Sequence, residues 1–127
     1  MSSIDPKRVL DAGEVRERLA GGLPGWRLEG DAIHRTIRTA GWKASLMVTT
    51  TIGHLAEVAW HHPDLRVSWG EVEVALTSHD AGGVTERDLA LAQRIDEVVG
   101  WRPGEEDGPF SGTPDDPRFA YLPPPEG

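Results

Sequence analysis

Two stretches of the chain alternate hydrophobic and polar residues with a period of two, which is typical of half-buried strands. Trp26 to Ile37 predicts one hairpin that turns near Gly30, and Leu65 to Leu76 predicts a second that turns near Gly70. In the second hairpin the apolar residues alternate strictly with polar ones. We therefore expect a sheet with one face on a core and the other in water.

Two helices are predicted from paired capping signals in front of apolar stripes. Asp11 and Glu14 have capping-box spacing before a helix that ends near residues 21–22. Thr85 and Asp88 repeat that spacing before a helix that Gly100 closes. Asp88 is therefore expected to act as part of a helix cap, whatever else it does.

A further helix is predicted over Ala44–Trp60, where apolar residues recur at helical spacing. The β-branched run Thr49–Thr51 favours a strand by propensity, so the two signals compete. Pro63 disfavours helical backbone in the residue before it, and we expect the helix to stop at the preceding histidine pair.

Composition narrows the class of protein. The 127 residues include 21 acidic and 13 basic ones, and the net charge of −8 argues against a nucleic-acid partner. There is no cysteine, which rules out disulfides and a thiolate nucleophile and agrees with a cytoplasmic location. No stretch approaches the ~18 apolar residues of a membrane span. We expect one domain over residues 1–101 and an extended, proline-rich tail over residues 102–127.

Three of the five histidines lie in one stretch with several carboxylates, and this stretch is the candidate site. His61 and His62 follow the predicted long helix, and His79 follows the last predicted strand. Glu57 lies four residues before His61, so we expect it to hold one ring nitrogen of that histidine. Asp88 is expected to orient His79. Several histidines and carboxylates in one stretch indicate acid/base chemistry rather than covalent catalysis. We expect the three histidines to converge in one cleft.

Two other interpretations of these residues stay open. Each histidine could have a structural role, as we expect for His34 and His54. A metal site is the other alternative, although adjacent histidines rarely bind one ion and no recognised ligand spacing is present. Its ligands would be His61, His62, His79 and Asp64.

The motif Glu57-x3-His61-His62-Pro63, followed by His79 and Asp88, resembles the signature of the pterin-4a-carbinolamine dehydratases. The resemblance extends from about residue 15 to residue 101. It implies an α+β fold in which three helices pack on one face of a four-stranded antiparallel sheet. It also implies a homodimer or homotetramer that needs no metal or other cofactor.

The resemblance implies a reaction as well. The family dehydrates 4a-hydroxytetrahydropterin to quinonoid dihydropterin, which allows aromatic amino-acid hydroxylases to reuse their cofactor. The implied catalytic residues are His61, His62 and His79, with Glu57 and Asp88 in support. The residues implied to line the pterin are His61, His62, Pro63, Ser78, His79, Asp80 and Ala81.

The resemblance also implies an alternative function, because some dehydratase-like proteins are binding modules. They serve as a dimerisation cofactor for a transcription factor or as a Rubisco assembly factor. This sequence departs from the family pattern where Ile37, Thr39 and Trp42 replace the usual phenylalanines. The retained histidines favour the enzyme.

Overall fold

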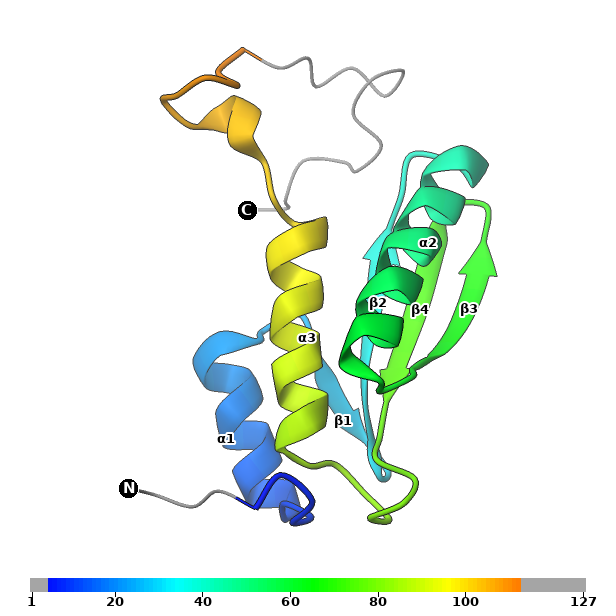
Figure 1. The fold of residues 1–127 in the computed structure, drawn as a ribbon, viewed down its shortest axis with the longest axis vertical. Coiled ribbons are helices and arrows are strands. Elements are labelled where there is room, and N and C mark those ends of the chain that lie inside the picture. The colour runs from blue at the N-terminus through cyan, green and yellow to red at the C-terminus, as the bar shows by residue number, and fades with distance from the viewer. Residues whose placement is uncertain (1–4, 113–127) are drawn as a thin grey trace.

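The computed structural model describes residues 5–112 of the chain (Figure 1). The elements are α1 (Ala12–Gly22), β1 (Arg27–Glu29), β2 (Ala32–Arg38), α2 (Trp42–Ala59), β3 (Asp64–Ser68), β4 (Glu71–Leu76), α3 (Glu86–Val99) and a 3-10 turn, η1 (Pro103–Glu105).

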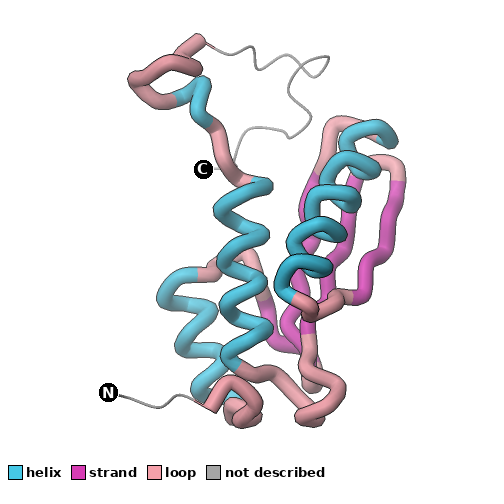
Figure 2. Tube along the Cα trace, in the orientation of Figure 1, coloured by secondary structure: helices cyan, strands magenta, loops and turns pink. Residues whose placement is uncertain are grey.

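The four strands form one antiparallel sheet in the order β1-β2-β4-β3 (Figure 2). Both predicted hairpins are present, as β1 pairs with β2 and β3 pairs with β4. Strands β2 and β4 join the hairpins, with Ile33 opposite Leu76 and Ile37 opposite Val72. All three α-helices lie on one face of the sheet (Figure 1). The predicted α+β fold with three helices on one face is therefore confirmed.

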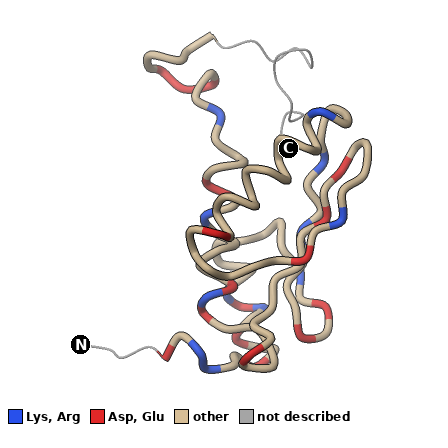
Figure 3. The backbone as a smooth tube through the Cα atoms, turned by 45° about the vertical axis from the view of Figure 1, so that its right-hand side comes forward, with Lys and Arg blue, Asp and Glu red and all other residues tan. Residues whose placement is uncertain are grey.

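The hydrophobic core fills the space between the sheet and the helices, as alternation along the strands predicts. Its members include Val15, Leu19, Ile33, Val48, Ile52, Val72, Val74, Leu76, Leu89, Ala92 and Ile95, all of them buried. The opposite face of the sheet is polar: basic and acidic residues follow the strands (Figure 3), and Arg27 pairs there with Glu29 and Glu73.

Helix α2 spans Trp42–Ala59, so the helical period prevailed over the strand propensity of Thr49–Thr51. The hydroxyls of Thr49 and Thr51 donate to the carbonyl oxygens of Ser45 and Met47, one turn earlier. These bonds satisfy the threonine hydroxyls within the helix. The helix starts two residues earlier and ends one residue earlier than predicted.

Both predicted capping boxes are confirmed. The Asp11 carboxylate accepts the Glu14 amide at 2.9 Å, and the Glu14 carboxylate accepts the Asp11 amide at 3.3 Å. At the start of α3, the Thr85 hydroxyl accepts an amide of the first turn while the Asp88 carboxylate accepts the Thr85 amide. Asp88 is thus held on α3 by local backbone contacts.

The predicted tail is only partly within the described residues. Its beginning forms η1, and the Phe110 ring packs edge-on against Trp101 with centroids 5.9 Å apart. The rest of the tail, residues 113–127, lies outside the described residues, and with it Phe119 and Tyr121. Within residues 5–112, no helix has the length and hydrophobicity that crossing a membrane requires.

Candidate active site

The site begins where α2 ends, at a left-handed residue. Trp60 has φ 50° and ψ 47°, a conformation that glycine usually supplies at a helix end. The Trp60 amide donates to the Glu57 carbonyl at 3.2 Å, and the His61 amide donates to the Ala56 carbonyl at 3.0 Å. This is the bond pattern of a Schellman motif. It turns the chain out of the helix immediately before the two histidines.

His61 and Asp88 form a buried pair. Nε2 of His61 lies 2.5 Å from Oδ1 of Asp88, and the Asp88 side chain is fully buried. The other carboxylate oxygen accepts the Ser78 hydroxyl and the Thr85 amide, each at 2.8 Å. Ser78 also shares a 2.8 Å hydrogen bond with the Thr85 hydroxyl. The buried carboxylate therefore has three partners, which fix its position and that of the imidazole.

His62 and Glu57 form a second pair, in a different environment. Nε2 of His62 lies 2.6 Å from Oε1 of Glu57. The side chains are 49% and 68% exposed. The Trp60 ring packs edge-on against the His62 ring, with centroids 4.9 Å apart. This pair is in contact with water, so its two side chains have far more freedom than His61 and Asp88.

The predicted partners of the histidines are wrong. Glu57 bonds His62 rather than His61, and Asp88 bonds His61 rather than His79. The left-handed turn at Trp60 is the reason, because it takes His61 off the helix on which the spacing of four would bring it to Glu57.

His79 lies on a tight turn between β4 and α3. The Ser78 carbonyl accepts the amides of Ala81 and Gly82 at 3.0 and 2.9 Å, which places His79 and Asp80 at the exposed tip. Within residues 5–112, the His79 ring makes no hydrogen bond, and no hydrogen bond or ion pair joins it to His61 or His62. Ser78, in contrast, faces inward and is 1% exposed.

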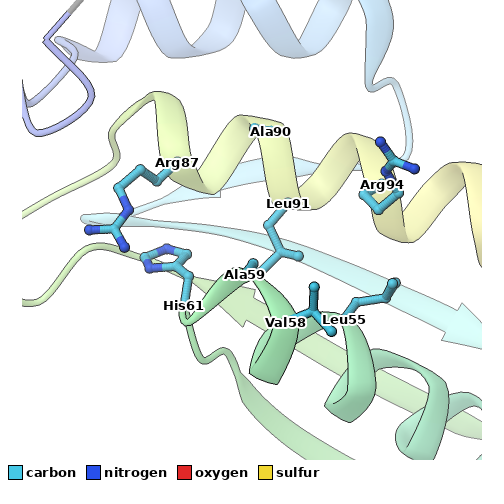
Figure 4. Close-up of a pocket in the computed structure, with 8 residues that line it drawn as sticks. All are labelled: Leu55, Val58, Ala59, His61, Arg87, Ala90, Leu91 and Arg94. Carbon is cyan, nitrogen blue, oxygen red and sulfur yellow. The ribbon is translucent and has the colours of Figure 1, made fainter.

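An open groove of about 530 Å³ runs between α2 and α3, with His61 at one end (Figure 4). It is lined by Leu55, Val58, Ala59, His61, Arg87, Ala90, Leu91 and Arg94. In Figure 4 the Arg87 guanidinium lies beside the His61 imidazole, and Arg94 lies farther along the groove. His62 and His79 are not among the lining residues. The groove has the volume of many small-molecule sites, which are typically about 300–1,000 Å³.

Arg87 and Arg94 are candidates that the sequence motif does not mark. The sequence indicated them only through the spacing of residues 87, 90, 91 and 94, which places these residues on a single face of α3. A row of residues of this kind becomes the wall of a groove only when a second helix packs beside it.

The ligands of the alternative metal site do not come together. Residues 5–112 contain no group of three or more His, Asp or Glu side chains placed to hold an ion.

One electrostatic shift lies next to this site, at the start of α3. The Arg18 guanidinium of α1 donates two hydrogen bonds to the Glu86 carboxylate, at 2.6 and 2.9 Å. These hydrogen bonds lower the pKa of Glu86 and raise the pKa of Arg18 from their ordinary values. The pair joins α1 to the helix that carries Asp88.

Comparison with known proteins identifies the family of the chain. The family model described as pterin 4 alpha carbinolamine dehydratase matches residues 8–98. The chain belongs to this family. Its relatives include proteins of Aquifex aeolicus, 48% identical, and Chloroflexus aurantiacus, 47% identical, each provisionally named a pterin-4-alpha-carbinolamine dehydratase. Each alignment covers 72% of this chain and 92% and 97% of the relative, respectively.

Solved structures agree with the fold of this dehydratase family. A transcriptional coactivator/pterin dehydratase from Brucella melitensis is similar with a TM-score of 0.67 and 27% identity, over 73% of this chain and all of that one. A pterin dehydratase-like protein described as a RuBisCO assembly factor of the alpha-carboxysome has a TM-score of 0.52 and 20% identity. That match covers 61% of this chain and 93% of that one, and it concerns the fold alone.

Proposed function

We propose that this protein is a lyase that dehydrates 4a-hydroxytetrahydropterin to quinonoid dihydropterin. The observation that supports this most is the buried His61–Asp88 pair, which borders an apolar groove in a chain of the dehydratase family. A histidine held by a buried carboxylate is suited to proton transfer near neutral pH. After a separate enzyme has reduced it to the tetrahydropterin, the product would serve an aromatic amino-acid hydroxylase in the cytoplasm.

The reaction moves two protons. The C4a–O bond breaks while the N5 lone pair forms the C4a=N5 bond, the oxygen takes a proton and leaves as water, and N5 then loses its own proton. In this mechanism the Asp88 carboxylate accepts a hydrogen bond from the Nε2–H group of His61 and stabilises the imidazolium. Nδ1 is then the nitrogen that donates a proton to the departing hydroxyl.

The other two histidines have proposed roles that follow from their exposure. His79 assists departure of the hydroxyl from the β4–α3 turn, and His62 orients the pterin or takes the N5 proton. Glu57 supports His62 through their 2.6 Å contact. The pterin would lie against residues 61–63 and 78–81. Because the Ser78 hydroxyl already serves Asp88 and Thr85, its side chain positions the site rather than touching the substrate.

An exposed apolar face on α2 supports a proposal about assembly. Trp42, Leu46, Met47 and Val58 are each at least 43% exposed, which is unusual for large apolar side chains. We propose that the protein is a homodimer or homotetramer. The same face supports the second candidate function, a binding module without catalysis that pairs with a transcription factor or with Rubisco.

A direct assay separates the two functions. The 4a-hydroxytetrahydropterin is generated by a hydroxylase, and its decay is followed by ultraviolet absorbance with and without the purified protein. We expect faster decay with the wild type, and loss of about 10²-fold or more in rate for His61→Ala or His79→Ala. His54→Ala, at an exposed position on α2, is the matched control.

Circular dichroism of each variant must accompany the rates. A variant that is slow but folded supports the catalytic role, whereas a variant that loses its fold shows a structural one. Wild-type protein that is no faster than buffer would overturn the enzyme proposal and favour the binding module.

A further inference from the structure

The groove between α2 and α3 has a charge opposite to that of the whole chain. The chain carries a net charge of −8, yet the charged residues that line the groove are Arg87 and Arg94, with no carboxylate among the lining residues. The rest of the lining is apolar apart from His61. An apolar groove with cationic groups on one wall has the chemistry to hold a ligand that is partly planar and partly anionic.

Both guanidinium groups have donors to spare. Arg87 donates one long hydrogen bond, 3.4 Å, to the Trp60 carbonyl, and within residues 5–112 no carboxylate lies within 4.0 Å of it. Arg94 lies 3.7 Å from Glu97, and these two side chains are 66% and 52% exposed. An exposed pair of this kind contributes little energy, and a guanidinium has five N–H donors. A ligand anion could therefore bind without breaking a strong contact.

We propose that this groove binds an anionic substituent on C6 of the pterin, with Arg94 and Arg87 as specificity-determining residues. This inference rests on the proposed function, which places the reacting carbon C4a at His61. C6 is separated from C4a only by N5, so a C6 substituent leaves the ring next to His61. Arg94 follows Arg87 by seven residues on α3, about 10 Å along the helix axis. The substrate class is thus a 4a-hydroxytetrahydropterin whose side chain ends in a phosphate or a carboxylate.

The chemistry of the anion is tested by binding, independently of turnover. Three of the probes are oxidised pterins, which do not react. The first has a neutral hydroxylated side chain on C6, the second has the phosphate ester of that side chain, and the third has a side chain of equal length that ends in a carboxylate. Inorganic phosphate alone is the fourth probe. Pterin fluorescence measures each Kd. We expect at least one anionic pterin to bind about tenfold or more tightly than the neutral one, since charge-assisted bonds are the strong ones.

Substitutions then assign the preference to the groove. Arg94→Gln should raise the Kd of the anionic pterin by about tenfold and leave that of the neutral pterin unchanged. Arg94→Lys should keep most of the preference, and Arg87→Gln should reduce it. Arg16→Gln removes one charge from an exposed position on α1, outside the groove, and should have no effect. Higher ionic strength should weaken the preference more in the wild type than in Arg94→Gln, which retains only the Arg87 charge in the groove.

Each result decides one of the two proposals. If the wild type turns over the neutral 4a-hydroxypterin but binds neutral and anionic pterins equally, the groove proposal is overturned and the dehydratase stands. If the anionic pterin binds in an Arg94-dependent way without turnover of any substrate, the dehydratase proposal fails and the anion site stands. Equal binding together with a dimer that buries Arg94 would assign the groove to a second copy of the chain and overturn the anion site.

Discussion

Two neighbouring histidines, each bonded to a carboxylate at almost the same distance, have entirely different surroundings. His61 and Asp88 are 2.5 Å apart and buried, whereas His62 and Glu57 are 2.6 Å apart and largely exposed. Asp88 also accepts two further hydrogen bonds from protein donors. The length of the hydrogen bond therefore does not distinguish the two pairs. Burial and the number of hydrogen-bond partners show which pair has a fixed position.

The difference has an energetic meaning. Removing one partner of a buried, hydrogen-bonded pair leaves polar groups without water and costs about 3–5 kcal/mol. Removing one partner of an exposed pair costs about 0–1 kcal/mol, because water replaces it. The comparison predicts that substitutions at Asp88 and Glu57 differ strongly although both remove a carboxylate from a histidine.

The largest expected effect is on stability at Asp88. Asp88→Ala should lower the free energy of unfolding by about 3–5 kcal/mol, because the Ser78 hydroxyl, the Thr85 amide and His61 lose their common acceptor. Glu57→Ala should lower it by less than about 1 kcal/mol. Urea unfolding followed by circular dichroism measures both.

A conservative variant keeps this test informative. Asp88→Asn retains shape and one acceptor oxygen, so it should fold with a smaller loss than Asp88→Ala while turnover stays low. Equal losses for Asp88→Ala and Glu57→Ala would mean that burial does not distinguish the two pairs.

The second effect is on rate. His61→Gln should reduce dehydration by about 10²-fold or more, the scale of a positioned acid, while the fold is retained. His62→Gln should reduce it less, because its partner Glu57 is exposed and its position is less fixed. Single-turnover absorbance measurements with both variants give the order, and the reverse order would assign the main proton transfer to the exposed pair.

A third, smaller effect separates the Asp88 network from direct contact with substrate. Ser78→Ala removes one of three donors to Asp88 and should cost about 1 kcal/mol of stability. Because the Ser78 side chain is buried, kcat should fall while KM for the pterin changes little. Ser68→Ala, at an exposed position on β3, is the control. A change confined to KM would place Ser78 in the substrate pocket instead.

The smallest effect comes from the surface pair Arg18–Glu86, which joins α1 to α3 and gives a scale for exposed ion pairs. The pKa of Glu86 is lowered because Arg18 donates hydrogen bonds to it. The stability that the Glu86 carboxylate contributes is therefore fully present above the pKa of about 4.3 that glutamate has in the unfolded chain. It is lost as the pH falls through the lower pKa of Glu86 in the folded protein.

Arg18→Gln should accordingly lower the free energy of unfolding at neutral pH by less than about 1 kcal/mol, with the difference from wild type shrinking in acid. Arg16→Gln serves as the control, because Arg16 is exposed and has no ion-pair partner among residues 5–112. Chemical unfolding from pH 7 down to pH 3 measures the trend, and a difference that grows in acid would contradict it.

Local signals in the sequence predicted most of the fold. The alternation of Leu65 to Leu76 and the two capping boxes depend on residues a few positions apart, and they are present as expected. The limits of α2 were missed by one or two residues, because helix ends depend on backbone contacts that residue type determines only in part.

The site was predicted only as a set of residues. The motif brought His61 and Asp88 to attention, but their pairing spans 27 positions and depends on how α2 and α3 pack. The left-handed turn at Trp60 had no signal in the sequence, since glycine is the usual residue there. Arg87 and Arg94 were missed because their spacing on α3 indicates only a shared helix face, which becomes the wall of a groove when α2 packs beside it.

The amide proton of Thr85 connects the backbone of α3 to the site, because it donates to the same carboxylate that holds His61. Its NMR chemical shift should therefore report the charge and position of Asp88 without any substrate. Its hydrogen-exchange rate should follow opening of the first turn of α3. An exchange experiment on this one amide would show how often the first turn of α3, and with it the His61–Asp88 pair, opens in the resting protein, on a scale independent of turnover.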